Sequence, residues 1–269
     1  MPSRLSVVAV LFLLLNFFPT QKGWSQKFSL GVKAGPSVTL GRFRDSDLRD
    51  IYTTKPVFGY MVGGLVIFPL EKDYSFISEI GYSQKGKKVL FNDNTWTNKT
   101  TFNFIDISMA LRKSYEFRLR DNIKSKIFFN IGPSIEYWLN GKGVIEAGGP
   151  SAEYTIVFNQ VAEGGNFNTN YYNDINRWLF GINLSVGADA PITSTQRIYT
   201  ELRFSLGQTN LGKKDSSSSI DILGFQDDLK MNLKTIILSV AYTFEFDLKE
   251  SKMGKSTKDK MIKRKRIKR

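Results

Sequence analysis

Hydrophobic and polar residues alternate at a period of two along most of the chain from Lys27 onward. No helical period longer than a turn or two interrupts this alternation. A period of two places successive side chains on opposite faces of an extended strand. The pattern predicts eight strands, whose alternating apolar positions span 28–34, 58–68, 74–82, 105–111, 127–137, 178–188, 198–206 and 236–244.

The connections between these strands alternate in length. Wide connections follow the first, third, fifth and seventh strands, around 41–55, 86–101, 140–176 and 208–232. Tight turns lie at 69–73 and 191–194, and a longer polar turn lies at 118–124. Long loops on one side and short turns on the other are typical of outer-membrane barrels. The sequence therefore predicts an all-β fold, an eight-stranded antiparallel up-and-down transmembrane β-barrel with its short turns in the periplasm.

The positions of glycine indicate which face of each strand points inward. A soluble barrel of the lipocalin type shows the same alternation with its apolar face inside. Glycine weakens a strand on a solvent face, whereas a narrow eight-stranded interior needs small residues. Gly64 alone lies on the apolar phase, and nine glycines lie on the polar phase: Gly31, Gly35, Gly59, Gly63, Gly81, Gly132, Gly181, Gly187 and Gly207. We therefore expect the polar phase inside and the apolar phase against outer-membrane lipid.

Aromatic residues near the predicted strand ends fit the girdles found at both membrane interfaces. They are Tyr60, Phe68, Tyr74, Tyr82, Tyr137, Trp178 and Tyr242. Phe244 or Phe246, at the end of the last strand, is placed to serve the barrel-insertion machinery, which is an expected partner.

Charged residues on the inward phase form the candidate site. They are Lys33, Glu79, Asp106, Arg112, Glu136, Glu201, Arg203 and Glu245. Charges buried in a small lumen must pair. Arg203 shares the inward phase with Glu201, and Arg112 shares it with Asp106, so these acids and bases can pair within or across strands. We interpret these residues as a lumen charge network that fills the barrel. A gated ion path and a carboxylate active site are the alternatives.

The composition restricts the chemistry available to the chain. Its 269 residues include neither histidine nor cysteine. This excludes a Ser-His-Asp triad, a thiolate nucleophile, disulfides and ordinary zinc sites. No spacing indicates a nucleophile beside a base, so we expect no enzymatic activity and no catalytic, cofactor or metal site.

The two ends of the chain differ from the barrel. Arg4, an apolar run over 5–18 and a small-residue site at 23–25 predict a secretory signal peptide over residues 1–25. The barrel is expected over 26–246, and 247–269 is expected to be a disordered basic periplasmic tail. That tail holds eleven Lys or Arg and three acidic residues.

The end of the tail offers an electrostatic contact to an acidic periplasmic partner or to the cell wall. The residues expected to make it are Lys263, Arg264, Lys265, Arg266, Lys268 and Arg269. A nucleic-acid partner is not expected, because the chain is exported and the charges are not accompanied by aromatic stacking residues.

Three segments resemble the PorT-like outer-membrane barrels of the Bacteroidetes type. Residues 103–112 (NFIDISMALR) resemble the family's Y-L-E-I-P-L-L-L-K strand, with Ser108 in place of the usual Pro. Residues 129–134 (FNIGPS) resemble the A-G-P strand, and 201–210 (ELRFSLGQTN) resemble the E-x-R-Y-s-x-G-L-x-N segment. The resemblance spans about 27–246 and implies the barrel fold. By analogy with the family's namesake, it also implies a non-enzymatic interaction or structural role as an accessory of type IX secretion. A narrow channel for ions or small solutes is the alternative function.

Overall fold

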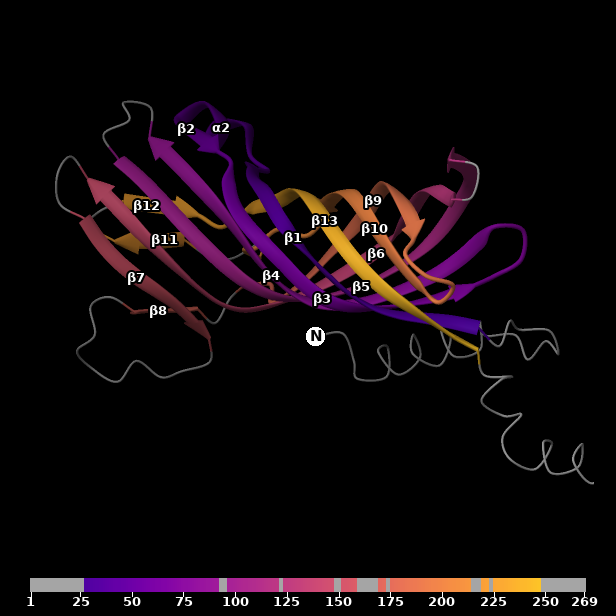
Figure 1. Ribbon diagram of the computed structural model, residues 1–269. Helices are drawn as coiled ribbons and strands as arrows, with labels where there is room; N and C mark the ends of the chain where they lie inside the picture. The colour runs from indigo at the N-terminus through magenta and orange to yellow at the C-terminus, as the bar shows by residue number, and fades with distance from the viewer. Residues whose placement is uncertain are drawn as a thin grey trace, which may run out of the picture.

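The computed structural model describes residues 27–91, 96–120, 123–147, 151–158, 169–172, 175–213, 219–222 and 225–247, and within them almost every element is a β-strand (Figure 1). The eight long strands are β1 (Lys27–Phe43), β3 (Val57–Pro69), β4 (Tyr74–Phe91), β5 (Trp96–Arg120), β6 (Ile123–Ala147), β9 (Trp178–Pro191), β10 (Gln196–Gly207) and β13 (Met231–Asp247). The shorter elements are α2 (Ser46–Ile51), β2 (Tyr52–Lys55), β7 (Ser151–Phe158), β8 (Thr169–Tyr172), β11 (Ser219–Ile222) and β12 (Phe225–Asp228).

The eight long strands close into a ring. Each of them pairs antiparallel with two neighbours, in the order β1-β3-β4-β5-β6-β9-β10-β13. The ring closes where β13 pairs with β1, from Lys27 opposite Asp247 to Phe43 opposite Met231. The predicted up-and-down barrel of eight antiparallel strands is therefore confirmed.

Side chains alternate between the lumen and the outside as the glycine phase predicted. Phe58 is 81% exposed on the outer wall, whereas Glu201 on the inner wall is fully buried. Aromatic pairs on the outer wall mark the two membrane interfaces. Tyr137 and Trp178 lie 4.7 Å apart between ring centroids, with tilted rings, on the loop side, and Phe28 and Phe246 stack at 5.4 Å on the turn side. The wall between them faces lipid.

Glycines let opposing backbones approach closely inside the ring. Gly63 of β3 lies directly opposite Gly81 of β4. A Cβ added to Gly63 would stand 2.8 Å from the Gly81 Cα, closer than real Cβ contacts come. Gly64, on the outer face, would place a Cβ 3.8 Å from its nearest neighbour. The interior therefore requires glycine where the outer wall does not.

Strands β4, β5 and β6 extend well beyond the prediction. The expected loops at 86–101 and 140–176 are largely strand: β4 continues to Phe91, β5 begins at Trp96, β6 continues to Ala147, and β7 and β8 follow. The expected turn at 118–124 is also strand except at 121–122, which lie outside the described residues. These parts of the prediction were wrong because strand pairing continues outside the membrane.

The polarity of the two faces inverts along these extended strands. On the membrane-facing part of β5, Ile105 and Ile107 point outward and Asp106 points inward. Further along the same strand, Phe102 and Phe104 are fully buried. Lipid surrounds the membrane-spanning part of the barrel, and water surrounds the part toward the loop end. Apolar side chains therefore lie on the outer face in the membrane and on the inner face beyond it.

The small elements gather at the loop end of the barrel (Figure 1). Asp45 caps the short helix α2 by accepting a hydrogen bond from the Asp47 backbone N–H, and β2 pairs with the end of β4. β11 and β12 form a separate hairpin. None of the helices among the described residues is long and apolar enough to span a membrane.

Candidate functional site

Four buried charges form an ion-pair cluster across the lumen. The Lys33 Nζ of β1 lies 3.1 Å from Glu79 Oε1 and 2.8 Å from Glu201 Oε1. The Arg203 Nη2 lies 2.6 Å from Glu79 Oε2, and its Nε lies 2.8 Å from Glu201 Oε1. Each carboxylate therefore meets both cations, and the four formal charges cancel. We call Lys33, Glu79, Glu201 and Arg203 the central cluster.

Asn130 connects the central cluster to Arg112. Its side-chain amide donates to Glu201 Oε2 at 3.2 Å and to the Ser185 hydroxyl at 2.9 Å, and its Oδ1 accepts from Arg112 Nε at 3.0 Å. Arg112 lies over the Phe128 ring, with its guanidinium carbon 3.8 Å from the ring centroid. Phe128 and Tyr199 meet edge to face at 5.5 Å and, with Leu65, form an apolar layer toward the periplasmic end.

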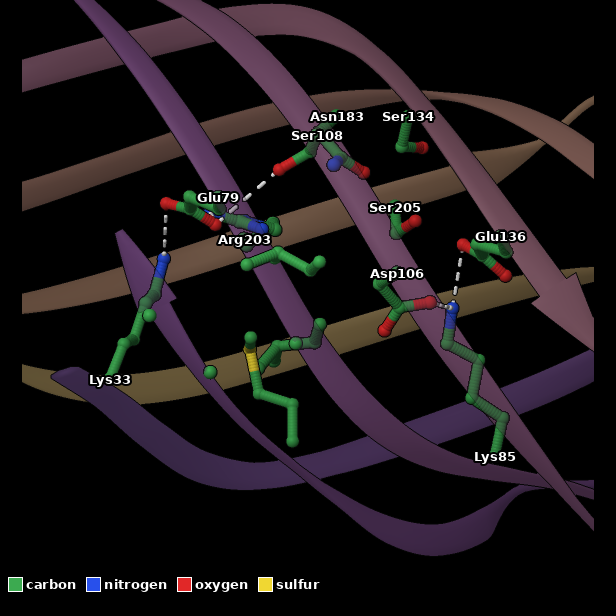
Figure 2. A pocket seen from close by; sticks show the side chains of 16 residues that line it. Lys33, Glu79, Lys85, Asp106, Ser108, Ser134, Glu136, Asn183, Arg203 and Ser205 are labelled. Atoms are coloured by element: carbon green, nitrogen blue, oxygen red, sulfur yellow. Dashed lines mark hydrogen bonds and ion pairs between the residues drawn. The ribbon is translucent and has the colours of Figure 1, made fainter. Parts of the chain in front are cut away.

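A second cluster lies toward the loop end. Asp106 and Glu136 stand directly opposite each other on β5 and β6, an arrangement of like charges that is unfavourable on its own. The Lys85 Nζ of β4 lies 2.6 Å from Glu136 Oε1 and 3.7 Å from Asp106 Oδ1. Lys85 therefore relieves the repulsion between the two carboxylates. Figure 2 shows Lys85 between them, apart from the central cluster.

An apolar layer closes the lumen above Lys85. Trp138 is fully buried, and its ring meets Phe102 at 4.9 Å and Phe158 at 5.0 Å between centroids. Phe43, Val89, Ile145, Ile156, Leu211 and Met231 belong to the same cluster. We call this cluster the loop-side cap. Because it is packed by side chains from the extended strands, it separates the charged layers from the cell exterior.

Little empty space remains between these layers. The cavity bounded by Lys33, Glu79, Lys85, Asp106 and Arg203 has a volume of about 20 Å³. That is room for about one water molecule. Side chains occupy the lumen in four successive layers: the apolar layer of Phe128, Tyr199 and Leu65, the central cluster, the Lys85 cluster and the loop-side cap.

The expected network and the observed arrangement differ at two of its residues. Arg112 does not pair with Asp106, since it bonds to Asn130 and stacks on Phe128. Glu245 lies near the periplasmic rim, 3.0 Å from Lys27 Nζ, and takes no part in the central cluster. The other six expected residues lie in the two clusters. The six tail residues named above, and the signal segment, lie outside the described residues.

Sequence reasoning missed Lys85 and Asn130. Lys85 stands on the same inward phase as Glu79, Gly81 and Ser83, so the signal was present. It was overlooked because the strand was expected to end at Tyr82. Asn130 is uncharged, and nothing in the alternation distinguishes it from other inward polar residues.

Residues 24–212, more than half of the chain, match the family described as outer membrane protein beta-barrel domain. The chain belongs to this family. A member of the outer membrane protein beta-barrel family resides in the outer membrane of a Gram-negative-type cell, which places the short turns in the periplasm and the long connections outside. The narrower resemblance to PorT-like barrels stays a prediction. No curated protein matches the chain significantly.

Several solved outer-membrane proteins are similar to this family member at low identity. Neisserial surface protein A is 12% identical, over 84% of this chain and 100% of that protein, with a TM-score of 0.39. OprG from Pseudomonas aeruginosa is 6% identical, over 81% and 95%, with a TM-score of 0.47. The outer membrane protease OmpT from Escherichia coli is 10% identical, over 84% and 99%, with a TM-score of 0.37. Likeness at this level says nothing about function.

Proposed function

We propose that the protein is a closed, non-enzymatic outer-membrane barrel that acts as an interaction or structural protein through its outer surfaces. The observation that carries this proposal is the ion-paired central cluster, which spans the lumen with its charges cancelled. An eight-stranded barrel has an interior just wide enough for side chains to fill. A barrel filled in this way offers its loops, its rims and its outer wall to partners.

Planar-bilayer recording of the purified full-length protein tests the closed lumen. We expect no resolvable single-channel current in symmetric salt, because the cavity between the charged layers holds about one water molecule. An Arg203→Gly, Glu79→Gly double variant is the matched control, since it removes the contact that crosses the lumen. A stable current from the unmodified protein would support the alternative of a narrow channel for ions or small solutes and overturn the closed barrel.

An accessory role in a secretion or envelope complex is the finer proposal. Its support is the resemblance of residues 103–112, 129–134 and 201–210 to PorT-like barrels, whose namesake takes part in type IX secretion. In vivo cross-linking from the extracellular connections and the periplasmic turns, followed by mass spectrometry, tests it. Recovery of components of a secretion complex would support the role. Recovery of lipid and barrel-insertion components alone would contradict it.

A further inference from the structure

Lysines align across neighbouring strands on the outer wall, above the membrane. Lys55 of β2 lies directly opposite Lys88 of β4, and Lys88 lies directly opposite Lys99 of β5. Lys142 of β6 stands opposite Thr101, two residues along β5 from Lys99 and on the same face. Lys55, Lys99 and Lys142 are exposed and Lys88 is half-buried. We call these four residues the lysine row.

No member of the lysine row forms an ion pair within the described part of the chain. No carboxylate there lies within 4.0 Å of any of the four ammonium groups, whereas Lys33 and Lys85 inside the barrel each meet two carboxylates. Like charges directly opposite each other weaken an antiparallel strand pair. An anion from outside the chain would relieve the repulsion along the row.

The lysine row continues the lipid-facing wall. Along β5, the outward side chains run from Ile107 and Ile105 in the membrane through Asn103 to Lys99. Asn103 bonds to Gln84 at 3.3 Å and to Asn140 at 2.6 Å, which forms an amide belt between the apolar wall and the lysines. The lysines therefore point sideways from the barrel just above the interface. A ligand that reaches them lies beside the wall, in the headgroup layer of the surrounding lipid.

A shallow groove on the same face gives the ligand a place to lie. It has a volume of about 500 Å³ and is lined by Lys99, Thr101 and Lys142, with Glu153 of β7 also on its wall. Lysine carries a compact charge on a long apolar stem, which can lie along the wall while its ammonium group meets a phosphate. The carboxylate of Glu153 repels an anion and so favours binding toward Lys88 and Lys99.

We propose that the lysine row binds the phosphate groups of a phosphorylated glycolipid in the outer leaflet, of the lipid A class, and holds that lipid against β4, β5 and β6. The ligand is a lipid because the row is continuous with the lipid-facing wall and its side chains lie on the outward face of that wall. The proposal is independent of whether the lumen conducts.

Native mass spectrometry of the full-length protein in detergent, titrated with diphosphoryl lipid A, tests the proposal. We expect the apparent Kd of Lys88→Gln, Lys99→Gln, Lys142→Gln to rise by about 100-fold, since each lysine near an anionic lipid contributes roughly fivefold. The matched control is Lys234→Gln. Lys234 also points outward near the loop side of β13, but it stands opposite Leu40 and Leu206. Its apparent Kd should stay within twofold of the unmodified protein.

The remaining arms identify the ligand. The unmodified protein should bind lipid A that lacks its phosphates as weakly as the triple variant binds diphosphoryl lipid A. Glu153→Gln should bind diphosphoryl lipid A more tightly than the unmodified protein does.

Heat-modifiable mobility on a detergent gel checks that each variant is folded. If the triple variant is not folded, Lys99→Gln and Lys142→Gln are compared singly, each with about a fivefold loss of affinity expected. An equal apparent Kd for diphosphoryl lipid A in the unmodified protein and the lysine variants would overturn the proposal. Row-dependent binding of inositol hexakisphosphate that is tighter than that of lipid A would overturn the lipid assignment in favour of a soluble polyanion.

Discussion

Arg203 of β10 bonds to Glu79 of β4 at 2.6 Å, although three strands separate β10 from β4 in either direction around the ring. The bond therefore spans the lumen between opposite walls. Both side chains are at least nine-tenths buried. Glu79 also contacts Lys33 of β1, and Arg203 also contacts Glu201 of its own strand. The same contact therefore links opposite walls of the barrel, which stabilises it, and obstructs the lumen.

Replacing Arg203 by Met should destabilise the barrel by about 3–5 kcal/mol, because it leaves two buried carboxylates with Lys33 alone. Urea-induced unfolding in lipid vesicles, followed by tryptophan fluorescence and by the folded band on a detergent gel, measures the change. The double variant Arg203→Met, Glu79→Gln should recover part of the loss, since it removes one charge of each sign. A double variant less stable than Arg203→Met would contradict the assigned pairing.

Gly63→Ala should destabilise the folded barrel by about 1–3 kcal/mol, because the added methyl group would meet the Gly81 backbone at 2.8 Å. Gly64→Ala, the next residue, is the matched control. Its methyl group would point toward lipid with 3.8 Å of clearance, so we expect a change within about 0.5 kcal/mol. Unfolding midpoints in the same vesicles distinguish the two. Equal midpoints for the two variants would show that the inward glycines are not required for close approach.

The membrane-spanning part of this fold was predictable from the sequence, and the part outside the membrane was not. Between the two aromatic girdles, the side chains that face outward are mostly apolar and most inward positions are polar or small, with the inward Phe128, Tyr199 and Leu65 as exceptions. Near Asn103 the outside changes from lipid to water, and the fully buried Phe102 and Phe104 then occupy inward positions. A prediction that expects apolar residues on the outer face throughout therefore ends the strand where this inversion begins.

The candidate site was predictable in its membership more than in its pairing. Phase alone placed Lys33, Glu79 and Arg203 inside, because a strand fixes the face of each side chain. Phase does not fix which walls meet, since that depends on register and on the curvature of the ring. For this reason the link between Arg203 and Glu201 was foreseen from one strand, and the link from Arg203 to Glu79 across the lumen was not.

Trp138→Ala should destabilise the protein by about 3–5 kcal/mol, because the ring is fully buried among Phe102, Phe104 and Phe158. The loop-side cap lies outside the membrane, so the loss should also appear as faster cleavage of β7 by protease added to intact cells. Trp178→Ala is the control, since its ring is 55% exposed on the outer wall. Unchanged protease sensitivity in Trp138→Ala, with the folded barrel retained, would show that the cap does not hold the extended strands together.

The last prediction is that the basic tail makes the periplasmic contact. Asp247 still pairs with Lys27 at the end of β13, so the tail to be tested is 248–269, one residue shorter than the sequence pattern indicated. Deleting 248–269 should leave the barrel folded, because every strand pairing described ends at or before Asp247. The deletion removes eleven Lys or Arg and two acidic residues, and with them most of the chain's formal net charge of +13. Retention of the full-length protein on isolated cell wall should therefore exceed that of the truncated protein at low salt. The difference should shrink at high salt, since exposed charges are screened within about 8 Å at physiological ionic strength.

A variant with Lys263, Arg264, Lys265, Arg266, Lys268 and Arg269 all changed to Gln keeps the length and is the matched control. Retention of that variant equal to the full-length protein would show that the tail binds through something other than its charge, and equal retention of all three proteins would show that the tail makes no contact.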